Sequence, residues 1–328
     1  MKAGIIGAGF FGEKHAVAMK AAGVDLVAAC RTNMDALRPL AQEFDFEAYT
    51  DYDLLLSDPR VEAVVIATPH ATHGQIAVAA AQAGKHILLE KPMAVSLAEC
   101  DEILATVEGR GVTLMLGHVT RFSRAFRLAK AMIEAGDLGA PVAGHAVMRK
   151  RWFEPNRRQW HLDREQGGGV LLTGGIHAVD RLHWLIGSPV TSVSAQFDTS
   201  FHEQRADDHG VMFFRYESGA AGTVHSVGYD NGAPEHGTEI TCTNGVIRIH
   251  SVEGVSVGQD EVWTKLPESG SAHWADEALV LEWQEFQRAV ATGTRPAITG
   301  RDARHVMASL FAAEESSRLG LEVSVSAP

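Results

Sequence analysis

The segment "AGIIGAGFFG", Ala3–Gly12, decides the fold of this chain. A short apolar run is followed at once by glycines in the spacing G-x-G-x-x-G, and a helix-forming stretch comes directly after them. In such a unit the first glycine permits a tight turn, the second lets a pyrophosphate approach the backbone, and the third allows the helix to pack closely on the strand. The helix N-terminus also favours an anion. We therefore expect a dinucleotide site, whose members are Gly7, Gly9, Phe10, Phe11 and Gly12.

Apolar strands alternate with helices through the first 120 or so residues. The run "VEAVVIAT" is apolar on both faces, as a buried parallel strand requires. Ser96 and Glu99 have the spacing of a capping box, and Pro39 fits badly inside one helix, which can begin there instead. Strands are expected at 3–8, 25–30, 61–68, 86–90 and 112–117, with helices at 13–22, 34–44, 74–84 and 96–109. This alternation predicts a Rossmann-type α/β fold with a doubly wound parallel sheet.

The pattern changes after Arg121. Helices are expected at 122–136 and 167–187, and β-strands follow from about 190 to 263. Turns are expected at Ser218-Gly219 and Asn244-Gly245, and Asn-Gly is a strong hairpin signal. Two helices, at about 274–290 and 302–317, close the chain. The sequence therefore predicts a dinucleotide-binding domain over 1–120 and an α+β domain with a largely antiparallel sheet over 121–328.

The composition argues against nucleic-acid and membrane roles. The net charge is −12, no basic run stands out, and no apolar run reaches the roughly 18 residues of a membrane span. The three cysteines (Cys30, Cys100 and Cys242) have no paired spacing, which favours neither a disulfide framework nor a thiolate metal site. A signal peptide is not expected, because the first strand follows directly on Met1 and Lys2. We expect a soluble, cytoplasmic protein without a metal.

The residue after the second strand bears on the choice of cofactor. An NAD site usually ends this strand in Asp or Glu, which binds the ribose 2′-hydroxyl, but here Arg31 and Thr32 follow it. An arginine pairs with a 2′-phosphate and stacks on adenine. NADP(H) is therefore favoured and NAD(H) stays possible. The alternative is that Arg31 is merely exposed while backbone groups hold the ribose.

The motif "LLEKP" places a lysine just beyond the end of a strand. In an open α/β sheet that edge faces the ligand crevice. A partly desolvated Lys91 beside a cationic nicotinamide would have a lowered pKa and would exchange protons with a substrate hydroxyl. Pro92 would fix the backbone so that the lysine points inward. The alternative is an ordinary solvated lysine. Other expected cofactor contacts near this edge are Thr68, Pro69, His73 and Glu90, although a structural role is the default for His73.

The helix "GGGVLLTGGIHAVDRLHWLIG", 167–187, carries two polar residues that share a face. Thr173 and His177 are four positions apart, so both project from one side of a helix. His177 is suited to proton transfer near neutral pH, and Thr173 would orient a substrate hydroxyl. Asp180 either orients His177 or bonds the backbone. The alternative for His177 is a satisfied, half-buried histidine.

Two glycines lie in the middle of the same helix. Each of Gly174 and Gly175 costs roughly 1 kcal/mol relative to alanine in a helix interior. Their presence predicts a close approach to the helix there, either by a nicotinamide or by neighbouring backbone. This strengthens the interpretation of His177 as a proton-transfer residue.

These motifs resemble the Gfo/Idh/MocA family, the glucose-fructose oxidoreductase and inositol dehydrogenase group, over nearly the whole chain. The resemblance rests on the glycine loop, "ATPHATHGQIAVAAAQAGKHILLEKPMA" (67–94), "GHVTRF" (117–122), the glycine-led helix and "TGRDARHVMASLFAAEESSRLG" (299–320). It implies a Rossmann domain, then an open-faced sheet domain that binds substrate and forms homodimers or homotetramers. It also implies a catalytic lysine at Lys91, an often cis proline at Pro92 and a catalytic histidine at His177. Many members carry Asp at the position of Thr173, so this residue departs from the common pattern.

The segment "RKRWFEPNRRQWHLDREQ", 149–166, should approach the substrate. Its aromatic residues would stack on or hydrogen-bond a sugar ring, and its arginines would bind a carboxylate or phosphate. The alternative is that most of them form domain contacts or a solvated loop. Arg121 is equally suited to an interdomain structural role and to ligand binding. The candidates in the segment are Trp152, Trp160, His161, Arg149, Arg157 and Arg158.

The leading hypothesis is an NAD(P)-dependent oxidoreductase that acts on a secondary alcohol or ketone of a sugar or cyclitol. Lys91, helped by His177, would take or return the hydroxyl proton. One alternative is a non-catalytic dinucleotide or sugar sensor, which the threonine at position 173 keeps open. Another is a reductase of a non-sugar carbonyl.

Overall fold

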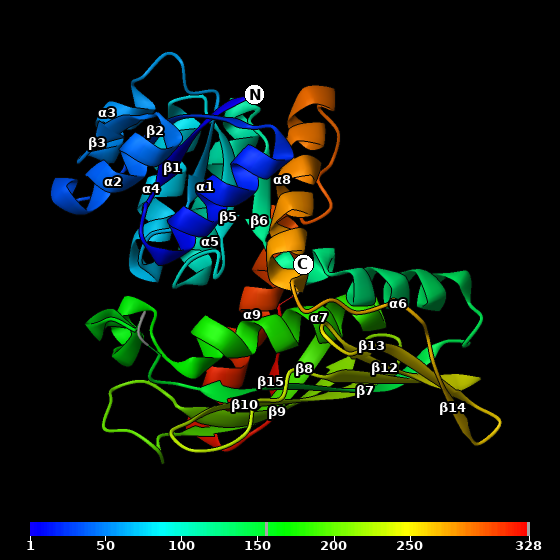
Figure 1. Ribbon diagram of the computed structural model, residues 1–328. Coiled ribbons are helices and arrows are strands. Elements are labelled where there is room, and N and C mark those ends of the chain that lie inside the picture. Colours follow the sequence, from blue (N-terminus) through cyan, green and yellow to red (C-terminus); the bar gives the residue numbers. More distant parts are fainter. Residues whose placement is uncertain (155–156, 327–328) are drawn as a thin grey trace. The chain divides into compact units, whose positions relative to one another are not determined.

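The computed structural model describes residues 1–154 and 157–326, so Pro155 and Asn156 of the 149–166 segment lie outside the described residues. The chain forms two compact units (Figure 1). The first unit comprises Met1–His118 and Leu279–Arg304, and the second comprises Val119–Ala278 and His305–Pro328. The first segment ends at His118, and the sequence-based division lies at residue 120. The assignment of Leu279–Arg304 to the first unit differs from the sequence-based division.

The first unit contains a parallel six-stranded sheet in the order β3-β2-β1-β4-β5-β6, which confirms the doubly wound fold. The order reverses between β1 and β4, and in open α/β sheets ligands bind at such a switch point. The strands are β1 (Lys2–Ile6), β2 (Asp25–Cys30), β3 (Glu47–Tyr49), β4 (Ala63–Ile66), β5 (His86–Glu90) and β6 (Leu114–Gly117). The helices are α1 (Phe10–Ala22), α2 (Met34–Phe44), α3 (Tyr52–Leu56), α4 (His73–Gln82) and α5 (Leu97–Arg110).

Helix α2 contains a proline in its interior, where the local preference of proline disfavours a helix. It runs without interruption through Pro39, whereas the sequence left open that the helix begins there. Asn33 caps its N-terminus by accepting a hydrogen bond from Ala36 N–H, and Leu37 and Leu40 bury its inner face. This cap and the burial of two leucines offset the hydrogen bond that proline removes. The short elements β3 and α3 follow it and were not expected.

The second unit is built on a nine-stranded sheet with the order β14-β13-β12-β11-β7-β10-β9-β8-β15. All neighbouring pairs are antiparallel except β7 and β10, as the largely antiparallel prediction requires. Helices α6 (Arg124–Ala135) and α7 (Ile176–Ile186) pack on this sheet (Figure 1). The strands are β7 (Pro141–Arg151), β8 (Val190–Asp198), β9 (His209–Tyr216), β10 (Ala221–Tyr229), β11 (Thr238–Cys242), β12 (Gly245–His250), β13 (Gly254–Gln259), β14 (Val262–Lys265) and β15 (Val323–Ser324).

Strand β7 was not predicted, although it lies near the centre of the sheet. Its inward residues include Ala146 and Met148, which are buried, while its outward residues include exposed His145 and Arg149. The basic residues at its C-terminal end make that part look like a loop. The expected hairpins at Ser218-Gly219 and Asn244-Gly245 join β9 to β10 and β11 to β12.

Two long helices, α8 (Trp274–Thr292) and α9 (Gly300–Leu319), contribute residues to both units. The part of them assigned to the first unit is anchored there by specific contacts. Trp283 is fully buried, Leu116 N–H donates to Ile298 O at 3.3 Å, and Arg304 pairs with Asp101 at 2.6 Å. Among residues 1–154 and 157–326, no helix combines the length and apolar character needed to cross a membrane.

Candidate active site

The glycine loop between β1 and α1 has the shape that a pyrophosphate needs. Gly7 has φ of +97°, and a Cβ there would lie 2.6 Å from the carbonyl carbon of Ala67. A Cβ on Gly12 would lie 2.4 Å from Gly7 O. A Cβ on Gly9, in contrast, would meet nothing within 4 Å. Gly7 and Gly12 are therefore required by close packing, while Gly9 keeps open space over the backbone at the helix N-terminus. The loop fits a dinucleotide.

The residues beside this loop differ in their contacts: Phe10 is exposed, whereas Phe11 and Arg31 contact other parts of the protein. The Phe10 side chain is 56% exposed, and the Phe11 ring packs edge-on against His15. The guanidinium of Arg31 donates from Nη1 to Ala8 O at 3.1 Å and to Ala36 O at 3.3 Å, so it braces the glycine loop. Thr32, which follows it, is exposed.

His73 links the ends of two strands. Its ring is buried, and its two nitrogens lie 2.9 Å from Thr68 O and 2.7 Å from Pro92 O. Burial lowers the pKa of His73, so the ring is neutral near pH 7 and donates to one of these two carbonyls. Thr68 and Pro69 follow β4, and the Thr68 hydroxyl accepts a hydrogen bond from Thr72 at 2.8 Å. Because both nitrogens of His73 face main-chain oxygens, this side chain holds the segment that contains Lys91.

Lys91 follows β5 directly, at the same edge of the sheet as the glycine loop. The Lys91–Pro92 peptide is cis, as the resemblance implied. Lys91 is half-buried, and its backbone N–H donates to Glu90 Oε2 at 3.3 Å. Glu90 is buried, and its Oε1 accepts from His15 Nε2 at 3.1 Å. Trp283 Nε1–H donates to His15 Nδ1 at 3.0 Å, which assigns the ring proton of a neutral His15 to Nε2.

A second buried carboxyl lies near Glu90. Glu282 is fully buried on α8, beside Trp283 in the chain. Burial and the nearby Glu90 carboxylate raise the pKa of Glu282 well above its usual value. Both causes favour the neutral form of the Glu282 carboxyl. Sequence reasoning missed His15, Glu282 and Trp283, because His15 lies 268 residues before its partner Trp283.

In the second unit the glycine-led segment begins with a π-helical turn, η5 (Leu171–Gly175), which continues into α7. Single π-turns inside helices occur frequently at functional sites. Among residues 170–186, Thr173, His177 and Trp184 are the ones that are not buried. Thr173 and His177 therefore share the accessible side of an otherwise buried helix, as their spacing predicts.

The glycines of this segment pack against its own unit. A Cβ on Gly168 would lie 2.5 Å from Trp160 O and His161 O, and a Cβ on Gly175 would lie 2.5 Å from Ser226 Oγ on β10. Gly174 lies on the Met148 side chain of β7. A close approach is thus present at Gly175, but it comes from the Ser226 side chain and not from neighbouring backbone as one expectation had it.

Asp180 and Arg121 form a buried ion pair. Arg121 Nη2 lies 2.6 Å from Asp180 Oδ1, and Arg121 Nε lies 3.1 Å from both carboxylate oxygens. The Asp180 side chain is 1% exposed and the Arg121 side chain is 9% exposed. Asp180 therefore joins α7 to the segment before α6 instead of serving only its own helix, and Arg121 has a structural role inside the second unit.

The residues of the 149–166 segment lie in different environments. Trp152 is 0% exposed, its Nε1–H donates to Gln204 Oε1 at 2.7 Å, and Arg157 stacks on its ring at 4.5 Å. Trp152 thus belongs to the core, so the expected sugar contact is not available to it in this structure. Trp160 is half-buried and stacks on the buried ring of His161 at 3.6 Å.

The arginines of this segment also have protein partners. Arg157 donates to Trp152 O at 2.9 Å and pairs with Glu154 at 3.1 Å, whereas Arg149 donates to Ala233 O at 3.1 Å. Arg158 N–H donates to His161 Nδ1 at 3.0 Å, which shapes the turn that carries His161. Two aromatic rings of this segment are accessible: Trp160 is half-buried and Phe153 is 42% exposed.

The comparisons with known proteins agree with both units. The model of the oxidoreductase family with an NAD-binding Rossmann fold matches residues 1–118, and the model of the GFO/IDH/MocA C-terminal domain matches residues 126–248. The scyllo-inositol 2-dehydrogenase (NAD(+)) of Bacillus subtilis (strain 168) is 30% identical over 338 residues, which cover 99% of this chain and 96% of that protein. The 1,5-anhydro-D-fructose reductase of Ensifer adhaerens is 27% identical over 327 residues, covering 97% and 96%. A probable dehydrogenase from Thermotoga maritima superposes with a TM-score of 0.85 at 26% identity, covering 99% and 98%.

Proposed function

Because the chain belongs to the Gfo/Idh/MocA family of oxidoreductases, we propose that it transfers a hydride between a nicotinamide dinucleotide and a secondary alcohol or ketone of a sugar or cyclitol. The observation that carries this proposal is the position of Lys91, at the same sheet edge as the glycine loop and held by Glu90 and His73. The relatives named above act, by their names, on an inositol and on an anhydro sugar. They support the substrate class.

The first unit supplies the groups that would hold the dinucleotide. The backbone at Gly9 and the N-terminus of α1 suit the pyrophosphate, and Phe10 offers an exposed aromatic face beside them. Thr68 and Pro69 line the end of β4, next to the switch point. When bound, the nicotinamide supplies or accepts the hydride.

Lys91 is the proposed proton carrier. In the oxidative direction its neutral amine takes the proton of the substrate hydroxyl, and in the reductive direction its ammonium returns that proton to the carbonyl oxygen. His177 is the proposed second proton-transfer residue and Thr173 an orienting hydrogen-bond partner. Thr173 cannot accept a proton as a carboxylate does, so in this chain the lysine and the histidine carry the acid–base work. Trp160 is the proposed stacking residue for the sugar ring.

A substrate panel tests this proposal. The purified chain is mixed with NAD⁺ or NADP⁺ and inositols, sugars and sugar alcohols, and with the reduced cofactors and the matching ketones. The nicotinamide absorbance reports turnover. Turnover of a polyol or its ketone is the expected result. A chain that binds the dinucleotide and turns over no panel member would instead be a sensor.

We further propose that NADP(H) is preferred and that Arg31 sets the preference, through a 2′-phosphate contact. Replacing Arg31 with aspartate is expected to lower the ratio of kcat/KM for NADPH to kcat/KM for NADH by about tenfold or more. The ratio is its own control, because Arg31 also braces the glycine loop through Ala8 O and loss of that contact would weaken both cofactors alike. An unchanged ratio would contradict the assignment.

We also propose that a second copy of the chain covers the sheet face opposite α7. Residues on this face include exposed Val211, His145 and His225, and half-buried Phe213. Val211→Glu would place a charge beside Phe213 on this face and is expected to convert an oligomer to a smaller species in light scattering. Val17→Glu, at an exposed position of α1, is the matched control and should leave the mass unchanged. A wild-type chain that is monomeric at micromolar concentration would contradict this proposal.

A further inference from the structure

The start of the helix that carries Thr173 and His177 is held from outside the helix. The first N–H groups of a helix have no partner within it and need acceptors from elsewhere. Val170 N–H donates to Asp207 O at 3.0 Å, and Leu171 N–H donates to Asp207 Oδ2 at 2.8 Å. One residue, 36 positions later than Leu171 in the chain, therefore caps this N-terminus with both its main-chain and its side-chain oxygens.

The helix start and Asp207 fit each other closely. Gly169 has φ of +99°, and a Cβ there would lie 2.1 Å from Asp207 Oδ1. A side chain at position 169 would therefore displace the carboxyl group. Gly169 O in turn accepts the N–H of Thr173 at 3.1 Å. The Asp207 carboxyl contacts Gly169 and Leu171, and Gly169 is hydrogen-bonded to Thr173. Thr173 is the residue that the proposed reaction uses.

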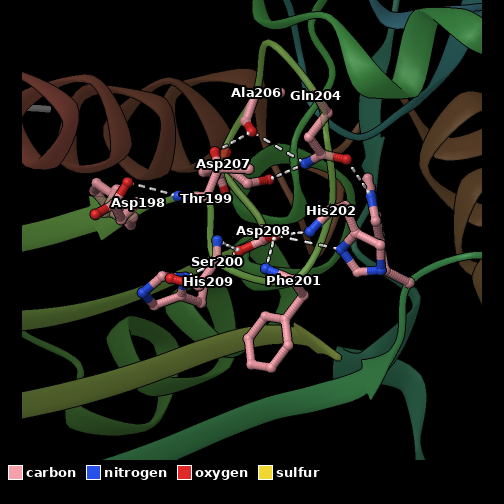
Figure 2. Close-up of polar contacts among 12 residues, drawn as sticks. Asp198, Thr199, Ser200, Phe201, His202, Gln204, Ala206, Asp207, Asp208 and His209 are labelled. Carbon is pink, nitrogen blue, oxygen red and sulfur yellow. Dashed lines mark hydrogen bonds and ion pairs between the residues drawn. The ribbon is translucent and has the colours of Figure 1, made fainter. Parts of the chain in front are cut away.

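Asp207 is itself held in place by a hydrogen-bond network (Figure 2). Gln204 Nε2 donates to Asp207 O at 2.8 Å and to Ala206 O at 3.0 Å. Gln204 Oε1 accepts from the buried Trp152 at 2.7 Å. The neighbouring Asp208 has a different task, because its carboxylate accepts from the N–H groups of Ser200, Phe201 and His202. The two adjacent aspartates serve the helix start and the loop before β9, respectively.

We propose that Asp207 is a positioning residue, which sets the orientation of the Leu171–Gly175 turn and thereby of Thr173 and His177. This inference rests on the proposed function. Neither aspartate stood out in the sequence, because the capped helix begins far away in the chain. Asp207 touches no reacting atom in this account and acts through the helix.

The charge of Asp207 changes near neutral pH. Burial raises the pKa of Asp207 to about 7; the hydrogen bond from Leu171 opposes the rise, and Glu314 adds to it. Glu314 forms a bidentate pair with Arg164, whose charge also opposes the rise. Asp207 lines a cavity of about 630 Å³, where the other charged groups are Asp198, Arg205 and Arg318. An ionised carboxylate accepts a stronger hydrogen bond than a neutral one and suits a helix N-terminus, so the cap tightens as the pH rises through about 7.

The test compares Asp207→Ala and Asp207→Asn with the control Glu203→Gln in the full chain, with the substrate that the panel identifies. Glu203 is exposed in the same loop and does not line the cavity beside Asp207. Alanine removes the side-chain acceptor, so kcat is expected to fall about tenfold or more while KM for the dinucleotide stays within about twofold. Asparagine keeps an acceptor without charge, so its kcat should match the wild type at about pH 5.5 and be about threefold lower at about pH 8.5. The control should follow the wild type throughout.

Thermal stability separates positioning from a merely structural role. The pKa of Asp207 is higher in the fold than its ordinary value of 3.8, so the neutral form stabilises the fold below about pH 4 and this contribution is lost as the pH rises through about 7. Asp207→Asn is therefore expected to melt at a higher temperature than the wild type at about pH 8 while turning over more slowly. A residue that only stabilised the fold would not combine these two effects.

Three results would overturn the inference. The first is a folded Asp207→Ala variant with the kcat of the wild type. The second is a ratio of the kcat of Asp207→Asn to that of the wild type that does not change with pH. The third is an Asp207→Asn variant that, at about pH 8, both turns over more slowly and melts at a lower temperature than the wild type. If Asp207→Ala does not fold, Asp207→Asn carries the test alone. If the wild type turns over no substrate, the proposed function fails, but amide hydrogen exchange in residues 169–177 still tests the cap. Exchange should be faster in Asp207→Asn than in the wild type at about pH 8, and equal rates would contradict the inference.

Discussion

Replacing Lys91 with alanine is expected to lower kcat by about three orders of magnitude while the affinity for the dinucleotide stays within about threefold. Lys91 is the proposed proton carrier, so its loss leaves the substrate hydroxyl without a base in the oxidative direction. The groups proposed to hold the dinucleotide are the backbone of the glycine loop and the N-terminus of α1, which this substitution does not touch. The measurement is steady-state turnover beside a fluorescence titration with the reduced cofactor.

Lys20→Ala is the matched control for Lys91. Lys20 is exposed on α1 of the same unit, away from the loop, and its removal should leave kcat and cofactor binding unchanged. Addition of small primary amines should partly restore turnover in Lys91→Ala, because they supply the missing base. A Lys91→Ala variant with kcat within about threefold of the wild type would remove Lys91 from the proton-transfer step.

The second large effect is on stability. Asp180→Ala is expected to lower the free energy of unfolding by about 3–5 kcal/mol, because it leaves the charge of the nearly buried Arg121 without its carboxylate. The pair joins α7 to the segment before α6, so the transition of the second unit should shift. Urea unfolding followed by tryptophan fluorescence measures this, since Trp184 lies 5.5 Å from the Arg121 guanidinium.

Two further variants make that result interpretable. Asp35→Ala removes an exposed ion pair with Arg38 on α2 and should cause no measurable change. The double variant Asp180→Leu with Arg121→Met replaces both charges by apolar groups of similar size, and it should recover most of the lost stability. A loss below about 1 kcal/mol in Asp180→Ala would mean that water reaches Arg121 and that the pair is not a buried one.

Local signals along the chain predicted the first unit well. The glycine spacing and the alternation of apolar strands with helices predict the doubly wound sheet, because five of its six strands are short, mostly apolar and bounded by a turn or cap. Strand β3, which begins with the exposed Glu47, carries no such signal. The segment Leu279–Arg304 belongs to this unit for a reason that local pattern does not contain. It is held by Trp283 on His15 and by Ile298 on Leu116, which are contacts between distant parts of the chain.

The sequence indicated which residue types belong to the candidate site, but it did not predict how deeply each of them is buried or what it contacts. Lys91, Thr173 and His177 have the accessibility expected of working residues, since each is half-buried. Trp152 has the composition of a sugar-binding residue but lies in the core, and burial depends on tertiary packing that the segment alone does not determine. Arg31 was interpreted from its position after β2, yet its bond to Ala8 O arises from the geometry of the loop.

Positioning groups were the least predictable part of the site. His73 bonds Pro92 O, which lies 19 residues later, and Asp207 bonds Leu171 N–H, which lies 36 residues earlier. These partners lie outside the local pattern around each residue. Nothing in the residue types distinguishes Asp207 from Asp208 beside it. Just before β9 the two side chains point to different sides of the chain: Asp207 bonds the start of the helix and Asp208 bonds the loop.

The central claim is that a hydride passes directly between nicotinamide and a sugar or cyclitol carbon. The most direct measurement is mass spectrometry of the alcohol formed from the matching ketone with a cofactor deuterated at C4 of the nicotinamide, using each C4 epimer in turn. The account predicts that one epimer gives product heavier by one deuterium at the former carbonyl carbon and that the other gives none. Turnover without transfer of deuterium from either epimer would contradict the account.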